Sequence, residues 1–123
     1  MARFVLLEHR WNGVHWDFML ESGESLRTWA IDAPIVAGTP LPARELAPHR
    51  PVYLDYEGEI SGDRGSVRRL DRGEYSTLAW ESDLVRVEVR GAQLIGTVTL
   101  RMMVEGGSTE AGCSWSFLLG NLD

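Results

Sequence analysis

The sequence predicts an all-β protein in which one compact domain, residues 1–123, closes into a barrel or a sandwich. Short runs of alternating apolar and polar residues recur at roughly ten-residue intervals, which is the period-two pattern of half-buried strands. Glycine is spread along the chain, and neither a linker nor an internal repeat divides it. A small domain with this many strands is expected to close on itself, because closure limits the number of exposed strand edges.

The alternating runs predict strands at residues 3–10, 14–20, 25–31, 51–56, 65–70, 75–80, 84–90, 93–103 and 113–119. A long segment, residues 32–50, separates the third and fourth of these strands, and its four prolines indicate irregular structure. One short helical turn near residues 43–46 fits within this loop. A loop of this length in a small domain is often functional.

Composition and charge exclude several classes of protein. The 12 basic and 18 acidic side chains give a net charge of −6, which argues against nonspecific nucleic-acid binding by bulk electrostatics. No apolar run reaches the roughly 18 residues of a membrane helix, and the N-terminus reaches a charge too early for a secretory signal. The single cysteine, Cys113, rules out an internal disulfide and fits a reducing compartment. A cytoplasmic protein is therefore expected.

The segment from His9 to Asp17 contains two of the three histidines and an aspartate within nine residues. Two imidazoles and one carboxylate suit a divalent metal that keeps open coordination positions for water or phosphate. In a strand, residues two apart share a face, so His15, Asp17 and Met19 point the same way. The residues between them are apolar and mark the opposite face as core.

Whether His9 joins this face depends on the turn that follows it. A two-residue turn at residues 12–13 would place His9 on the opposite face. A three-residue loop at residues 11–13 would pair His9 with His15, and it needs a left-handed third residue that forms a bulge, which Gly13 can supply. A shared metal site therefore requires the longer loop. The alternative is a pair of ordinary strand histidines beside a surface carboxylate.

The third histidine, His49, shares a face with Tyr53 and Asp55 if its segment is extended. His49 and Tyr53 would then lie about 13 Å apart along the chain, too far to bind one ion but suited to flank an extended phosphodiester. Cross-strand packing is the alternative role for Tyr53. The arginines that follow, Arg64 and Arg69 among them, are either part of a solvated strand and turn or a rim that contacts phosphate.

The hairpin residues also belong to a longer pattern. Glu8-His9-x5-His15-Trp16-Asp17-Phe18-x-Leu20-Glu21 resembles the signature of the 3′-phosphoesterase domain of bacterial DNA ligase D. Further segments resemble that family in the same order. They are Leu-Arg-Thr-Trp-Ala-Ile at 26–31, His49-x3-Tyr53-x2-Tyr56-Glu57-Gly58-x-Ile60, Leu-Asp-Arg-Gly-Glu-Tyr at 70–75, and Gly-Ala-Gln-Leu-Ile-Gly-Thr-Val-Thr-Leu at 91–100.

The resemblance implies a compact β-barrel and a divalent metal, with manganese as the first expectation and zinc or cobalt as alternatives. Members of the family remove a terminal phosphate or ribonucleoside from DNA 3′ ends before end joining. Carried over to this sequence, His9, His15 and Asp17 would be the metal ligands. His49 would contact the scissile phosphate and act as a general acid, and Tyr53 would donate a hydrogen bond to the phosphate or to water on the metal.

The sequence departs from the family pattern where the family contacts phosphate. The family has an arginine two residues after the metal-binding aspartate, and Met19 stands there, whose thioether cannot replace a guanidinium. The family's Pro-Lys-Gly-Pro is replaced by Asp32-Ala33-Pro34, its glycine-rich loop is shortened to Ser61–Gly65, and its N-terminal arm has no counterpart. The candidates to bind phosphate instead are Arg44, Arg64 and Arg69.

The sequence thus predicts a metal-dependent phosphoesterase of DNA repair that processes DNA 3′ ends with weak or altered activity. End-joining ligase and polymerase proteins are the expected partners, and no membrane association is expected. Two alternatives remain open. One is a phosphoesterase that acts on another phosphate ester, and the other is a non-catalytic relative that binds metal or phosphate.

Overall fold

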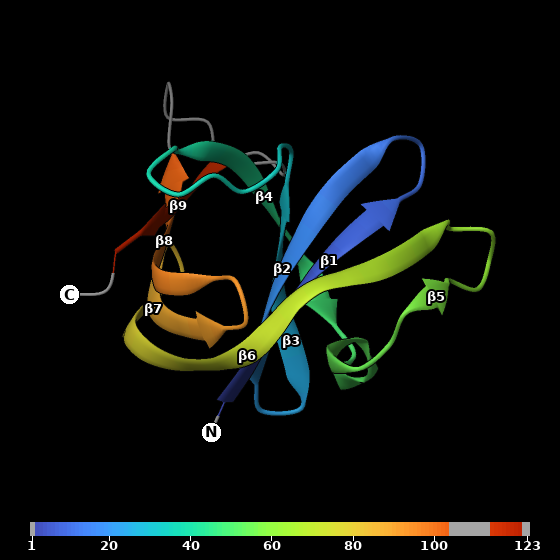
Figure 1. Ribbon diagram of the computed structural model, residues 1–123, viewed down its shortest axis with the longest axis horizontal. Coiled ribbons are helices and arrows are strands. Elements are labelled where there is room, and N and C mark those ends of the chain that lie inside the picture. Colours follow the sequence, from blue (N-terminus) through green and yellow to red (C-terminus); the bar gives the residue numbers. More distant parts are fainter. Residues whose placement is uncertain (1, 104–113, 122–123) are drawn as a thin grey trace.

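The computed structural model describes residues 2–103 and 114–121, which form nine strands and one short 3-10 helix (Figure 1). In chain order the elements are β1 (Ala2–Arg10), β2 (Val14–Ser22), β3 (Ser25–Ile31), β4 (Leu41–His49), η1 (Pro51–Leu54), β5 (Gly58–Glu59), β6 (Ser66–Trp80), β7 (Leu84–Gly91), β8 (Ile95–Met103) and β9 (Ser114–Gly120). Residue 113, where the last strand was predicted to begin, lies outside the described residues.

Eight of these strands close an antiparallel barrel. The order runs β1-β2-β3-β4-β9-β8-β7-β6, and β6 pairs back with β1, while the short β5 is added at the far edge of β6. Closure leaves each of the eight strands with two neighbours, which confirms the predicted all-β fold and selects the barrel over the sandwich.

The long strand β6 joins two strands that the sequence predicted separately, 65–70 and 75–80. Its first part pairs with β1 and its last part with β7, so the strand turns a corner of the barrel (Figure 1). Gly73 lies where these pairings overlap, and a Cβ there would stand 2.1 Å from the carbonyl oxygen of Arg90. The glycine therefore marks a close approach of two strands rather than a break.

Two further expectations were wrong. Residues 41–49 form β4 instead of a loop with a helical turn near 43–46, so the irregular connection is confined to residues 32–40. β9 pairs only with residues 41–44 of β4, so Pro48 lies beyond that ladder and is not required to donate to it. Residues 51–56 are not a strand, because Pro51–Leu54 form η1, and proline suits the first position of a helix.

The barrel strands bury apolar side chains on both faces. One large cluster includes Phe4, Phe18, Trp29 and Phe117 and fills the barrel interior. A second, smaller cluster forms on the outer face of the sheet, from Val5, Leu7, Met19, Leu26, Leu54 and Val67. Tyr53, Tyr56 and Ile60 pack against the second cluster, so η1 and β5 cover the outside of the barrel there.

A buried carboxylate fixes the turn between β7 and β8. Asp71, on β6, is 5% exposed and accepts hydrogen bonds from four backbone N–H groups. Three of these donors are consecutive, at Ala92, Gln93 and Leu94, at 2.9, 2.9 and 2.6 Å. Asp71 therefore supplies the acceptors that the backbone N–H groups of this turn would otherwise lack.

Candidate metal centre

The turn between β1 and β2 is the three-residue loop that a shared metal site requires. Arg10 pairs with Val14 and His9 with His15, which confirms the predicted register. Gly13 has a φ of +113°, in the region that favours glycine, and Asn12 has a φ of +53°. His9, His15 and Asp17 consequently share the outer face of the sheet.

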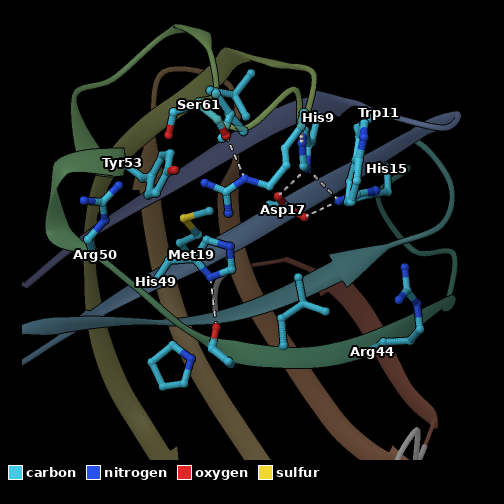
Figure 2. A pocket seen from close by; sticks show the side chains of 16 residues that line it. His9, Trp11, His15, Asp17, Met19, Arg44, His49, Arg50, Tyr53 and Ser61 are labelled. Atoms are coloured by element: carbon cyan, nitrogen blue, oxygen red, sulfur yellow. Dashed lines mark hydrogen bonds and ion pairs between the residues drawn. The ribbon is translucent and has the colours of Figure 1, made fainter.

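The donor atoms of these three side chains converge. His9 Nδ1 lies 3.1 Å from His15 Nε2 and 3.5 Å from Asp17 Oδ2, and His15 Nε2 lies 3.1 Å from Asp17 Oδ1 (Figure 2). Donors bound at about 2.1 Å to one metal stand about 3.0–3.4 Å apart, at octahedral or tetrahedral angles. The two 3.1 Å spacings fall within that range and the third, at 3.5 Å, lies just above it. With one donor atom taken from each residue, all three atoms lie within 4.8 Å of one another, which is close enough for a group that could hold one metal ion.

A hydrogen bond on the far side of His9 orients its ring. Nε2 lies 3.0 Å from the carbonyl oxygen of Arg64, and because a carbonyl only accepts, Nε2 carries the proton. The unprotonated nitrogen of the neutral ring is then Nδ1, which faces His15 and Asp17. A backbone carbonyl behind a histidine is a common way to hold a metal ligand in the required tautomer.

The buried carboxylate of Asp17 also fits a cation. It is 2% exposed, and its Oδ1 accepts no hydrogen bond from the described residues although His15 Nε2 is close. Burial raises the pKa of Asp17, but interactions with His15 and His9 outweigh burial, so the pKa lies below its ordinary value. The pKa of His9 is raised, chiefly by its interaction with Asp17 and against the effect of burial. The buried group is therefore an anion with an unsatisfied oxygen, as a metal ligand should be.

These three side chains lie in the wall of a cavity of about 750 Å³. The cavity brings together His9, His15, Asp17, His49, Tyr53, Arg44 and Arg64, all of which were candidates from the sequence (Figure 2). Met19 lies beside them and is 1% exposed, so the predicted face of β2 is confirmed. Arg69 is not part of the lining, because its backbone N–H and guanidinium contact Glu57.

The chain bends between His49 and Tyr53, because β4 ends at His49 and η1 follows at once. Their ring centroids are only 5.7 Å apart, instead of the separation of an extended segment. His49 Nδ1 lies 2.9 Å from the carbonyl oxygen of Ala47, so Nδ1 carries a proton and Nε2 is the nitrogen left for other partners. The pair lines the cavity together with His9, His15 and Asp17 (Figure 2).

Three arginines line the cavity, and they differ in how they are held. Arg44 is paired with Asp32 at 3.6 Å. Arg64 donates from Nε to the carbonyl oxygen of Ser61, and the guanidinium of Arg50 lies 6.0 Å from the centre of the Tyr53 ring. No carboxylate within the described ranges forms an ion pair with Arg50 or Arg64, so these two charges are uncompensated.

Sequence reasoning missed Arg50 and Trp11 as residues of the cavity. Arg50 directly follows His49, so its position beside a candidate catalytic histidine was an available signal. Trp11 was an apolar residue inside a turn, a place where apolar residues usually have no core to join. The signal for Arg50 is weak without knowledge of how η1 folds back over the sheet.

Comparison with family models identifies the domain. The model of the DNA ligase D 3′-phosphoesterase domain matches residues 7–102. This chain belongs to that family. The match confirms the resemblance seen in the motifs, and it spans the hairpin, His49, Tyr53 and the barrel strands up to β8.

Two further findings complete the comparison. None of the curated proteins compared with the chain matches it. Within residues 2–103 and 114–121, no helix has the length and apolar character needed to span a membrane.

Proposed function

We propose that this member of the DNA ligase D 3′-phosphoesterase family is a manganese-dependent phosphoesterase that removes the terminal phosphate from DNA 3′ ends. The observation that carries the proposal is the convergence of His9, His15 and Asp17, with one donor atom of each within 4.8 Å of the others, in a cavity that also contains His49 and Tyr53. Family membership supports the choice of substrate. We propose that the protein acts in the cytoplasm, alongside end-joining ligase and polymerase proteins.

The chemistry assigned to each residue follows from its hydrogen-bonding state. A divalent cation, when bound, supplies Lewis-acid stabilisation of phosphate charge and activates water. Protonated His49 presents Nε2–H, since Nδ1–H is already given to Ala47, and it passes this proton to the 3′ oxygen as the phosphorus–oxygen bond breaks. The Tyr53 hydroxyl donates a hydrogen bond to a phosphate oxygen. Water forms the new bond to phosphorus, so the products are a 3′ hydroxyl and inorganic phosphate.

The guanidinium of Arg64 binds phosphate in place of the family arginine that Met19 replaces, although less completely. Arg64 lines the cavity, its Nε is fixed by Ser61, and its charge is not neutralised by a neighbouring carboxylate. Arg44 contributes less, because Asp32 compensates its charge. Arg69 has Glu57 as its partner and does not line the cavity. Fewer free cations predict weaker phosphate binding than a full set of phosphate-binding arginines and lysines would give.

Met19 favours a second candidate function, a phosphoesterase on a phosphate ester other than DNA. Its side chain is buried among apolar neighbours beside the metal ligands, where the family places a phosphate-binding arginine. Without this arginine the site should bind a strongly anionic polymer such as DNA less tightly, whereas the three candidate metal ligands are unaffected. Comparison of DNA with small phosphate esters separates the two candidates.

The test is release of inorganic phosphate from an oligonucleotide that ends in a 3′ phosphate. We expect release with manganese and none with a chelator. Asp17→Asn and His15→Ala should abolish release, and Asp83→Asn, which alters an exposed carboxylate in the turn between β6 and β7, should leave it unchanged. His49→Ala should lower kcat by about 10²- to 10⁴-fold, as loss of a general acid does.

The possible outcomes separate the hypotheses. Release from small esters but not from DNA would support the second candidate. Metal binding that depends on Asp17, without release from any ester under manganese, zinc or cobalt, would identify a non-catalytic relative and remove both enzymatic proposals. A chelator-resistant activity would show that the three donors do not serve the reaction.

A further inference from the structure

An indole ring stands exposed on the wall of the metal cavity. Trp11 occupies the first position of the turn between β1 and β2, directly after the strand that carries His9. It is 46% exposed and still belongs to the lining of the cavity. Figure 2 shows its ring upright beside His9 and His15, on the opposite side of Asp17 from Tyr53 and Arg50.

The position of Trp11 is fixed by its neighbours. Its ring is nearly parallel to that of His9, with an interplanar angle of 21° and centroids 6.3 Å apart. Its backbone N–H donates to the carbonyl oxygen of Gly13. Gly65, with a φ of +78°, allows the chain to pass so close that a Cβ there would lie 2.8 Å from the Trp11 Cβ. The indole is therefore a preorganised surface, held on one side and open to solvent.

The cavity offers few positive charges to a nucleic acid, and the exposed ring can supply affinity by stacking instead. The protein carries a net charge of −6, and within the cavity only Arg50 and Arg64 among the described residues lack a compensating carboxylate. Two such phosphate contacts predict a shallow dependence of affinity on salt, a slope of about −1.4 for a single strand. Binding of a nucleotide chain must then draw on another source, and stacking of a base on an aromatic ring is the usual one.

We propose that Trp11 is a nucleobase-binding subsite, which stacks against the base of the 3′-terminal nucleotide and so brings its phosphate to the metal ligands. This subsite rests on the proposed function, because a base is present only if the substrate is a nucleic acid. His9 and Trp11 lie on one hairpin with their rings stacked, so the metal centre and the base platform are positioned by the same three-residue turn. Every base has a flat face, so the subsite is tolerant of sequence.

The experiment compares two oligonucleotides that end in a 3′ phosphate, one with a normal terminal nucleotide and one whose terminal nucleotide is abasic. Binding is measured without divalent metal, so that no turnover occurs, and kcat and KM are then measured with manganese. We expect Trp11→Ala to weaken binding of the normal oligonucleotide by about 5- to 150-fold, the range of base–aromatic stacking. Binding of the abasic oligonucleotide should not change, and Trp11→Phe should retain most of the affinity.

Intrinsic fluorescence provides a second readout. The normal oligonucleotide should quench the emission of Trp11, and this quenching should disappear in Trp11→Phe. It should persist in Trp80→Phe, which removes another exposed indole that does not line the cavity. Thermal unfolding of each variant shows whether the fold is intact.

Each result bears on the subsite. Absence of quenching, an equal loss for the normal and abasic oligonucleotides, or no loss in Trp11→Ala would overturn the proposal. If the base-dependent binding is found but no phosphate is released with manganese, the subsite stands and the proposed enzymatic function fails. If phosphate is released equally well by Trp11→Ala, the function stands and the subsite fails.

Discussion

Replacement of Asp71 by asparagine tests how strongly one carboxylate holds the barrel together. Oδ1 accepts from the backbone N–H groups of Arg72 and Ala92, and Oδ2 accepts from those of Gln93 and Leu94. An asparagine has one acceptor oxygen and one NH₂ group, so either orientation of the amide points a donor at two backbone donors. No rotation of the side chain restores all four bonds.

The expected loss is about 3 kcal/mol. Hydrogen bonds to a charged acceptor contribute about 1.5–3 kcal/mol each, and two are lost, although water reaches part of this turn. The entropy of unfolding for a domain of 123 residues is about 0.26 kcal/mol/K, so Tm should fall by about 12 °C.

Thermal unfolding by circular dichroism measures this fall, with urea unfolding as an independent check. Asp83→Asn is the matched control, since it makes the same chemical change at an exposed position of the turn between β6 and β7, and its Tm should shift by less than about 2 °C. Metal affinity should be unchanged in Asp71→Asn, because Asp71 does not line the cavity. A fall in Tm below about 3 °C would refute the reasoning, because the backbone donors would then have found other partners.

Three further predictions concern the site and the fold. Manganese at 100 times its Kd should stabilise the protein by about 2.7 kcal/mol, or about 10 °C in Tm, and His15→Ala should remove this gain; equal stabilisation of both proteins would place the metal elsewhere. Gly65→Ala should lower both Tm and metal affinity, because a Cβ would meet the Arg10 carbonyl oxygen at 1.9 Å and the φ of +78° disfavours alanine; an unchanged melting curve would contradict this. Burial raises the pKa of Tyr75, so the unfolded chain loses its hydroxyl proton first, and the stabilisation present below about pH 10 should decline as pH rises through the folded-state pKa. Urea unfolding across that range measures the decline, and Tyr75→Phe should show a smaller one; identical slopes would argue against the assignment.

The sequence predicted the hairpin of β1 and β2 well, because local rules decide its register. Period-two alternation assigned the faces of β2, and the glycine at position 13 supplied the left-handed residue of a three-residue loop, so the pairing of His9 with His15 followed. For residues 41–49, in contrast, local rules led to a wrong prediction because of the prolines in this segment. They indicate irregular structure locally, yet this segment forms β4 because β3 and β9 offer it partners.

Residues brought together by tertiary packing were harder to predict. Arg50 lines the same cavity as Trp11 because η1 folds over the second cluster, and no local pattern encodes that placement. For the same reason the sequence could not separate Arg64, which lines the cavity, from Arg69, which contacts Glu57. Identical side chains five residues apart are distinguished by which neighbour the fold gives them.

The location of the cavity outside the barrel has a consequence for how such a protein diversifies. The packed interior around Trp29 and Phe117 is separated from the cavity by the thickness of the sheet, so changes in the segment from Arg50 to Gly65 need not disturb the barrel's own packing. Within that segment, exposed charged side chains such as that of Arg64 can be exchanged at little cost to folding, whereas Leu54 is buried in the second cluster and Gly65 lies against Arg10. The barrel therefore stays constant while the exposed side chains of this segment vary, and selectivity for another phosphate ester can be acquired there.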